Sequence, residues 1–165
     1  MDACTWPTSP SSRLASGSFA YVAFVTDAYA RRIVGWAVST SQHTRTLPLV
    51  ALDQSISWTA RHGDTHGLVH SDMGWQYQHR WWRQRLKALG IRQSMSRKGN
   101  CLDNAATEQV FGHLKDEFYT GRRFDSFDEF KRELDGYIVH WNTRRRQQQL
   151  NGRTPIEYRE MTLTT

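Results

Sequence analysis

Two apolar, β-rich runs stand close together near the start of the chain, at residues 19–27 (FAYVAFVTD) and 31–40 (RRIVGWAVST). Only three residues, AYA, separate them, so the pattern predicts an antiparallel hairpin. The runs are apolar at almost every position rather than at alternate positions, and this favours strands that are covered on both faces. The hairpin is therefore expected in the interior of a layered fold.

Strands and helices alternate along the rest of the chain. The expected order is helix 44–60, strand 67–71, helix 76–89, strand 91–95, helix 102–118 and helix 127–146. Each of these helices has apolar residues three and four positions apart. A strand, a helix and a second strand in succession form the crossover unit of a parallel sheet. The sequence thus predicts the α/β class, with a mixed sheet and helices on its faces.

The charge balance favours an anionic partner. Lys and Arg outnumber Asp and Glu by 22 to 16, a net charge of +6, which suits nucleic acid, although many basic proteins are merely soluble.

Cys4 and Cys101 lack the spacing of a zinc knuckle or a disulfide framework. Apolar runs are too short for a membrane span and no secretory signal is seen, so a cytoplasmic, nucleoid-associated protein without a membrane partner is expected.

Two carboxylates stand at positions that suit metal chemistry. Asp72 directly follows the strand 67–71, and ligands bind at strand ends in open α/β sheets. Glu108 lies in the helix 102–118, with 35 residues between the two acids. Mg²⁺ prefers oxygen ligands and assists phosphoryl transfer, so acids on two elements are candidate ligands. Taken singly, an Asp after a strand often caps a helix and a helical Glu is often solvated.

Three blocks in this order resemble the integrase core of bacterial insertion-sequence transposases: HSDMGWQY, QSMSRKGNCLDNAATEQVFGHLKDE and YIVHWNTRRRQQQLNGRTPIEYR. The likeness is to the IS-three-like group and runs from about Phe19 to Tyr158. It implies a ribonuclease H-like fold with a mixed five-stranded sheet, and an Asp–Asp–Glu triad that binds two Mg²⁺ or Mn²⁺ ions. Asp72 matches the second Asp and Glu108 the Glu. The implied reaction is DNA cleavage followed by strand transfer into target DNA.

The family's first Asp has no counterpart in this sequence. Counting back from Asp27 leads to Thr8, in a stretch that is neither acidic nor strand-like, TWPTSPSSR. We therefore expect residues 1–18 to be a disordered or aberrant leader and the first strand to be missing or degraded. Residues 19–120 are expected to form the catalytic core, and residues 121–165 a helical extension of the same domain.

A truncation or a frameshift is one hypothesis for this loss. Codons for WPTSPSSR, read two nucleotides later, can encode Ala-Asp-Leu-Thr-Phe-Val-Pro, which is the family's block; the gene's nucleotide sequence tests the idea. Asp2 and Asp27 are the nearest carboxylates, and neither is expected to replace the missing ligand. Asp27 is instead expected to hydrogen-bond the backbone of the hairpin turn.

Several basic residues are candidate DNA contacts. Arg97 and Lys98 precede the helix of Glu108, and Lys115 lies seven residues after Glu108 on the same helical face. The cluster at 144–146, including Arg144 and Arg145, suits DNA as well as a solvated helix end. The stretch HRWWRQR interleaves arginines with aromatics, but helical spacing favours a core role for its tryptophans.

Three functions remain open from the sequence. The first is a divalent-metal DNA strand-transferase, acting on element ends and target DNA with further copies of itself or intact transposase subunits. The second is a non-catalytic DNA-binding or assembly remnant, favoured by the missing Asp. The third is a hydrolytic nuclease of the same fold, which the same metals would serve.

Overall fold

The structure is a computed structural model of the chain. It describes residues 2–7, 14–15, 17–41, 46–61, 67–95 and 105–163, and within these only the backbone of residues 2–7, 59–61, 105–108 and 162–163. The expected DNA contacts Arg97 and Lys98 lie outside the described residues, as does Thr8.

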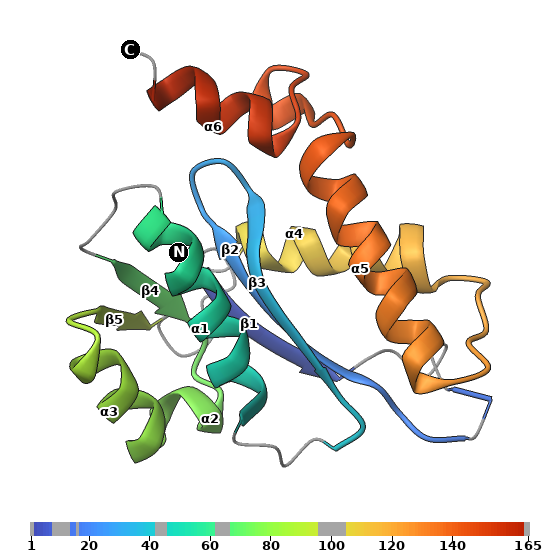
Figure 1. The fold of residues 1–165 in the computed structure, drawn as a ribbon, viewed down its shortest axis with the longest axis horizontal. Coiled ribbons are helices and arrows are strands. Elements are labelled where there is room, and N and C mark those ends of the chain that lie inside the picture. Colours follow the sequence, from blue (N-terminus) through green and yellow to red (C-terminus); the bar gives the residue numbers. More distant parts are fainter. Residues whose placement is uncertain are drawn as a thin grey trace.

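One mixed sheet of five strands forms the centre of the fold (Figure 1). The strands, in the spatial order β3–β2–β1–β4–β5, are β1 Asp2–Pro7, β2 Tyr21–Asp27, β3 Arg32–Ser39, β4 Leu68–Ser71 and β5 Arg92–Met95. The expected hairpin is confirmed, since β2 pairs antiparallel with β3. The expected parallel crossover is also present, because β4 pairs parallel with both β1 and β5.

The first strand is present, contrary to the sequence-based expectation. Residues Asp2–Pro7 form β1, antiparallel to β2 and parallel to β4. The prediction was wrong because it judged residues 1–18 by their Ser, Pro and Gly content, most of which follows β1. A gap between β2 and β4 would leave two rows of backbone hydrogen-bonding groups unpaired, and β1 fills that gap. Leu14 is also ordered, buried against Phe124.

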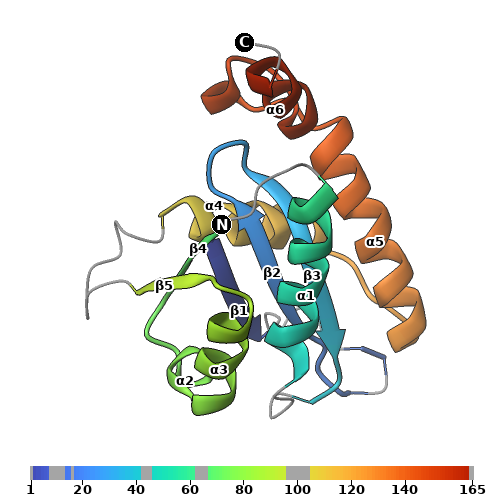
Figure 2. The same ribbon diagram turned by 60° about the vertical axis from the view of Figure 1, so that its left-hand side comes forward.

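Helices cover both faces of the sheet, as expected. They are α1 Thr46–Arg61, α2 Trp75–Gln78, α3 Arg80–Ala88, α4 Ala105–Leu114, α5 Phe127–Thr143 and α6 Pro155–Leu163. On one face α1, α2 and α3 pack over Ala23, Val25 and Val69. On the other face α4 and α5 pack over Val22 and Phe24 (Figure 2). Strand β2 thus contributes to two hydrophobic cores, which explains its nearly continuous apolar sequence.

The observed helices differ from the expected bounds at several points. The predicted helix 76–89 is interrupted at His79, whose extended backbone starts α3 and whose ring Nδ1 accepts a hydrogen bond from Trp81 N at 3.4 Å. Beyond α4 the chain continues as a π-helix, Lys115–Tyr119, and a 3-10 helix, Gln148–Leu150, follows α5. No helix in the described part of the chain is long and apolar enough to cross a membrane.

Candidate active site

Asp72 lies at the end of β4, where the sequence predicted a ligand-binding position. Its carboxylate is half-buried, and Oδ1 accepts a hydrogen bond from Gly74 N at 2.8 Å. Asp72 does not cap the helix that follows, because the N-cap of α2 is Gly74 and carries no side-chain cap. The alternative role as a helix cap is therefore excluded for this residue.

Gly74 lies where a larger side chain would crowd the side chains of Asp72 and Gln76. A Cβ on Gly74 would lie 2.8 Å from Asp72 Oδ1 and 3.0 Å from Gln76 Nε2, closer than ordinary van der Waals contact. The φ angle of Gly74 is −54°, which any residue adopts. A larger residue at this position would therefore require the side chains of Asp72 and Gln76 to move, and Asp72 Oδ1 now accepts its hydrogen bond from Gly74 N.

Glu108 lies in a helix, as the sequence predicted, and belongs to the first turn of α4 because the observed helix begins at Ala105. Only its backbone is described, so the position of its carboxylate stays a prediction. The helix itself is firmly held, because Val110 and Leu114 are buried in the core beneath it. Helix α4 also contacts β1, the strand beside β4. The two elements that carry Asp72 and Glu108 therefore flank the same strand.

The register of β1 identifies the residue level with Asp72. Asp2 is the partner of His70 and Ala3 is the partner of Ser71 in the parallel pair of β1 with β4. Continuing the same register by one residue beyond the end of β4 places Cys4 level with Asp72. The residue at this level of β1 is therefore a cysteine rather than an acid, and it precedes Thr8, the position reached by counting back from Asp27.

Asp27 has the structural role that the sequence predicted. Its Oδ1 accepts a hydrogen bond from Tyr29 N at 3.1 Å, across the hairpin turn. Its Oδ2 lies 3.6 Å from Arg159 Nη1, which ties the turn to α6. Asp27 therefore helps to hold the hairpin turn in place against α6.

The basic residues fall into two groups. Lys115 and Arg144 are exposed, and neither makes an ion pair with a residue of the described ranges. Arg145 is different, with only 17% of its side chain exposed and three hydrogen bonds to the carboxylate of Glu117, at 2.6 to 3.0 Å. Its guanidinium also lies over the ring of Trp141, 4.5 Å from the centroid. DNA contact by Arg145 stays a prediction, and its described contacts are structural.

Glu117 is the centre of this ion-pair network. The hydrogen bonds from Arg145 hold the pKa of the Glu117 carboxyl below its usual value, and a hydrogen bond from Tyr137 Oη at 2.9 Å acts in the same direction. Burial, together with this bond to Glu117, raises the pKa of Tyr137. Because Glu117 follows α4 and its partners belong to α5 and the segment after it, the network joins α5 to the helix that carries Glu108.

The block YIVHWNTRRR has a structural function that sequence reasoning missed. Trp141 Nε1 donates to Arg31 O at 2.9 Å, and Asn142 binds both backbone groups of Ile33. Both residues are buried. The signal was present, since Trp141 and Asn142 lie three and four positions after Ile138, which is a core residue of α5.

Trp81 and Trp82 also have the expected structural role. Trp82 is fully buried in the core under α3, against the ring of Tyr77. Trp81 is partly buried beside the same core. The prediction that helical spacing places these rings in the core is confirmed.

The donor set suits one hard cation better than a pair. Asp72 and Glu108 offer the oxygen ligands that Mg²⁺ prefers, and Mg²⁺ commonly needs only one or two carboxylates because water and phosphate complete its shell. A thiol at the Cys4 position is a soft ligand and suits Mg²⁺ poorly. Among the residues whose side chains are described, no group of three or more His, Cys, Asp or Glu side chains forms a metal site.

Known proteins share this sequence and this fold. The chain matches the Integrase core domain family over residues 6–101, and a second Integrase core domain family over residues 108–163. It is 38% identical over 157 residues to the putative transposase InsK for insertion sequence element IS150 of Escherichia coli strain K12, which covers 95% of this chain and 54% of the relative. It is 36% identical over 144 residues to a putative transposase for IS986/IS6110 of Mycobacterium tuberculosis, over 84% of this chain and 51% of the relative.

Solved retroviral integrase cores have the same fold. The catalytic core domain of BIV integrase aligns with a TM-score of 0.60 at 22% identity, over 99% of this chain and 96% of that chain. The HTLV-2 integrase catalytic core domain, solved in complex with magnesium, aligns with a TM-score of 0.63 at 8% identity, over 95% and 93%. The fold is thus ribonuclease H-like. The chain spans about half the length of the two curated relatives named above, and it belongs to the integrase core domain family of insertion-sequence transposases.

Proposed function

We propose that this chain is a transposase catalytic core that cleaves DNA and transfers strands with the help of a divalent metal ion. The observation that carries the proposal is the arrangement of the elements that carry the two acids. Asp72 directly follows β4, Glu108 lies in the first turn of α4, and β1 lies beside β4 and in contact with α4. The DNA substrates, element ends and a target, follow from the likeness to transposases.

Asp72 and Glu108 would hold a Mg²⁺ or Mn²⁺ ion together with oxygens of the DNA backbone. When bound, such an ion activates the attacking oxygen and stabilises the leaving one. Gly74 N fixes one oxygen of Asp72, so the carboxylate enters the reaction already oriented. The buried residues of α4 and the Glu117–Arg145 ion pair keep the backbone of Glu108 in place.

The candidate basic residues would bind the DNA backbone. Lys115 is exposed two turns after Glu108, and Arg144 is exposed at the end of α5. Arg97 and Lys98 precede α4 in the sequence and would reach the same strand. Contacts of this kind position DNA without reading its sequence.

A second function is favoured by one observation, the register of β1. With Cys4 level with Asp72, two acids of this chain, Asp72 and Glu108, match a triad for which the family likeness implies three. A core of this kind could bind DNA, or join intact transposase subunits, without catalysing transfer. This non-catalytic assembly role is the alternative to the enzyme.

Strand transfer by the purified chain distinguishes the two functions. The assay uses a duplex with free 3′-hydroxyl ends, a plasmid target, and Mg²⁺ or Mn²⁺. We expect joined products from the unaltered chain, and a loss of about a hundredfold or more in Asp72→Asn and Glu108→Gln. The matched control is Asp116→Asn, an exposed acid on the π-helix, which should retain activity.

Each outcome assigns one function. Activity that needs Asp72 and Glu108 but not Asp116 supports the enzyme. A folded chain that binds the duplex and yields no product with either metal overturns the catalytic proposal and leaves the assembly role. Activity that survives Asp72→Asn would show that the reaction uses other residues.

A further inference from the structure

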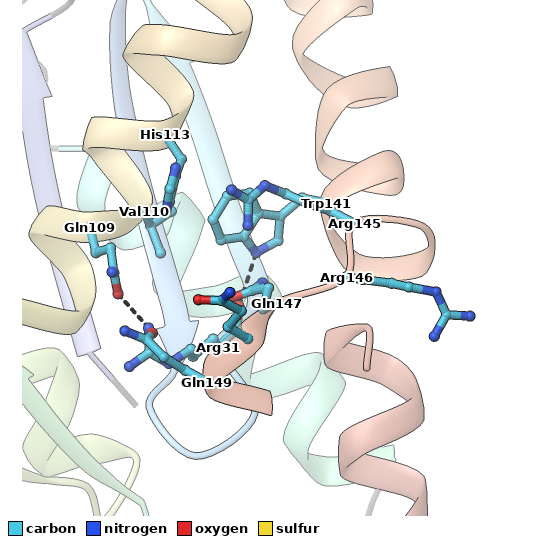
Figure 3. Close-up of a pocket in the computed structure, with 10 residues that line it drawn as sticks. Arg31, Gln109, Val110, His113, Trp141, Arg145, Arg146, Gln147 and Gln149 are labelled. Carbon is cyan, nitrogen blue, oxygen red and sulfur yellow. Dashed lines mark hydrogen bonds between the residues drawn. The ribbon is translucent and has the colours of Figure 1, made fainter. Parts of the chain in front are cut away.

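A cavity of about 320 Å³ opens between α4, the turn of the β2–β3 hairpin and the segment after α5 (Figure 3). Its lining includes Arg31, Gln109, His113, Arg145, Arg146 and Gln147. Gln109 directly follows Glu108 in α4, so the cavity adjoins the helix of the candidate active site. The lining is rich in hydrogen-bond donors and carries several positive charges.

Arg31 reaches this cavity from a strained backbone. Its φ angle is +55°, in the left-handed region that disfavours every residue with a Cβ. The hydrogen bond from Trp141 Nε1 to Arg31 O, at 2.9 Å, holds the turn in this conformation. Glycine would adopt the same backbone without strain. Residues with strained backbone angles cluster at functional sites, so the Arg31 side chain is a candidate for a functional role.

The charge of Arg31 is not neutralised by any described residue. Its guanidinium donates to the neutral amide oxygen of Gln109. The neighbouring arginines are paired, Arg145 with Glu117 and Arg146 with Glu157. A guanidinium presents five N–H donors in a planar fork that matches the oxygens of a phosphate. Arg31 therefore supplies the cavity with a free positive charge and with donors.

Gln147 provides a second, independent sign of a ligand. The residue is only 8% exposed, and its amide Nε2 has no hydrogen-bond partner among the described residues. A buried amide donor without an acceptor is costly, and most such groups in native proteins have a partner. An acceptor that enters the cavity would satisfy Gln147 and neutralise Arg31 together.

We propose that this cavity binds a backbone phosphate of the DNA on which the core acts. A phosphodiester offers a negative charge that would pair with Arg31 and an acceptor oxygen for the amide of Gln147. The proposal rests on the proposed function for its ligand, because DNA enters through the likeness to transposases. It assigns to this cavity a positioning role, in which a phosphate is fixed beside the first turns of α4.

DNA binding in EDTA tests this proposal separately from catalysis. Fluorescence anisotropy with a labelled duplex would be measured over a series of salt concentrations for the full chain. Arg31→Gly removes the charge and relieves the strained φ, so the variant should stay folded. Arg132→Gln is the control, because it also removes one positive charge, from a side chain of α5 that is 72% exposed. A second variant, Gln147→Leu, removes the unpaired donor.

We expect Arg31→Gly to bind the duplex about tenfold more weakly, with the salt slope reduced by about one. Gln147→Leu should weaken binding in the same direction, and Arg132→Gln should leave it within about twofold. Equal binding by Arg31→Gly and Arg132→Gln would overturn the proposal. A second outcome would also overturn the proposal. Inorganic phosphate would raise the melting temperature only when Arg31 is present, while DNA binding would not depend on Arg31. The cavity would then bind free anions and not DNA. A failure of strand transfer leaves this binding test unaffected.

Discussion

The side chain of Asn142 pairs with the backbone of Ile33 through two hydrogen bonds. Its Oδ1 accepts from Ile33 N and its Nδ2 donates to Ile33 O, each at 2.9 Å. Ile33 belongs to β3, an edge strand, next to the irregularity between Val25 and Thr26 of the neighbouring strand. An edge strand exposes unpaired backbone groups, and α5 satisfies two of them at this point. The amide thus anchors α5 to the sheet.

Replacement of Asn142 should destabilise the fold. In Asn142→Leu the backbone groups of Ile33 lose both partners while they remain buried, which costs about 2–4 kcal/mol in the free energy of unfolding. Urea denaturation measures this change. Thr143→Ala is the matched control, because the next side chain is exposed and should shift stability by no more than about 0.5 kcal/mol. Equal effects of the two substitutions would contradict the anchoring role.

Gly35 should tolerate no larger side chain. It lies in β3 directly beneath α1, and a Cβ built there would lie 1.9 Å from Ala51 O. Because the obstacle is helix backbone, Gly35→Ala should lower the free energy of unfolding by about 3 kcal/mol or more. Gly136→Ala is the control, since Gly136 lies on α5 with open space around its Cβ position and should gain about 0.5–1 kcal/mol. A stable Gly35→Ala chain would show that α1 can move away from the sheet.

The sequence predicted most of the fold because hydrophobic periodicity reports burial. Residues 19–27 are apolar at successive positions, and Val22 and Phe24 face one core while Ala23 and Val25 face the other. The first strand was missed because it lacks such a hydrophobic pattern. The sequence of β1, DACTWP, has no clear hydrophobic period, and its place is determined by the open edges of β2 and β4 rather than by its own residues.

The candidate site was only partly predictable. Asp72 and Glu108 stand out in the sequence because Asp72 directly follows a predicted strand and Glu108 lies within a predicted helix. The role of Arg145 could not be read from the sequence, because its partner Glu117 is 28 residues away and a helix intervenes. The cavity around Arg31 likewise needed the structure, since it combines the hairpin turn with segments far apart in the chain.

The ion pair between Arg145 and Glu117 should make stability depend on pH. The pKa of the Glu117 carboxyl is lowered below its ordinary value of 4.5 in the folded chain, chiefly by the hydrogen bonds from Arg145. A lowered folded pKa gives stability that is present above the unfolded pKa and is lost as the pH falls through the folded pKa. The difference in stability between the unaltered chain and Arg145→Gln should therefore be largest above about pH 4.5 and shrink in acid.

Urea midpoints from about pH 3 to pH 7 measure this difference. Arg145→Gln also loses the contact with the ring of Trp141, but that loss is independent of pH and shifts the whole curve. Arg132→Gln serves as the control, because its pair with Glu133 is long, 3.8 Å, and exposed. A constant difference across the pH range would mean that the Glu117 ion pair contributes nothing to stability.

A carboxylate at the Cys4 position should strengthen metal binding. The register of β1 puts Cys4 level with Asp72, and an Asp there would add a hard, charged ligand to a site that has two acids. In Cys4→Asp the apparent affinity for Mg²⁺ should rise about tenfold or more, measured by the metal-dependent shift in melting temperature, and strand transfer in Mg²⁺ should rise with it. Asp2→Asn is the control. If Asp2 already served as the third ligand, Asp2→Asn would abolish metal binding and Cys4→Asp would add little, and the register argument would then be wrong.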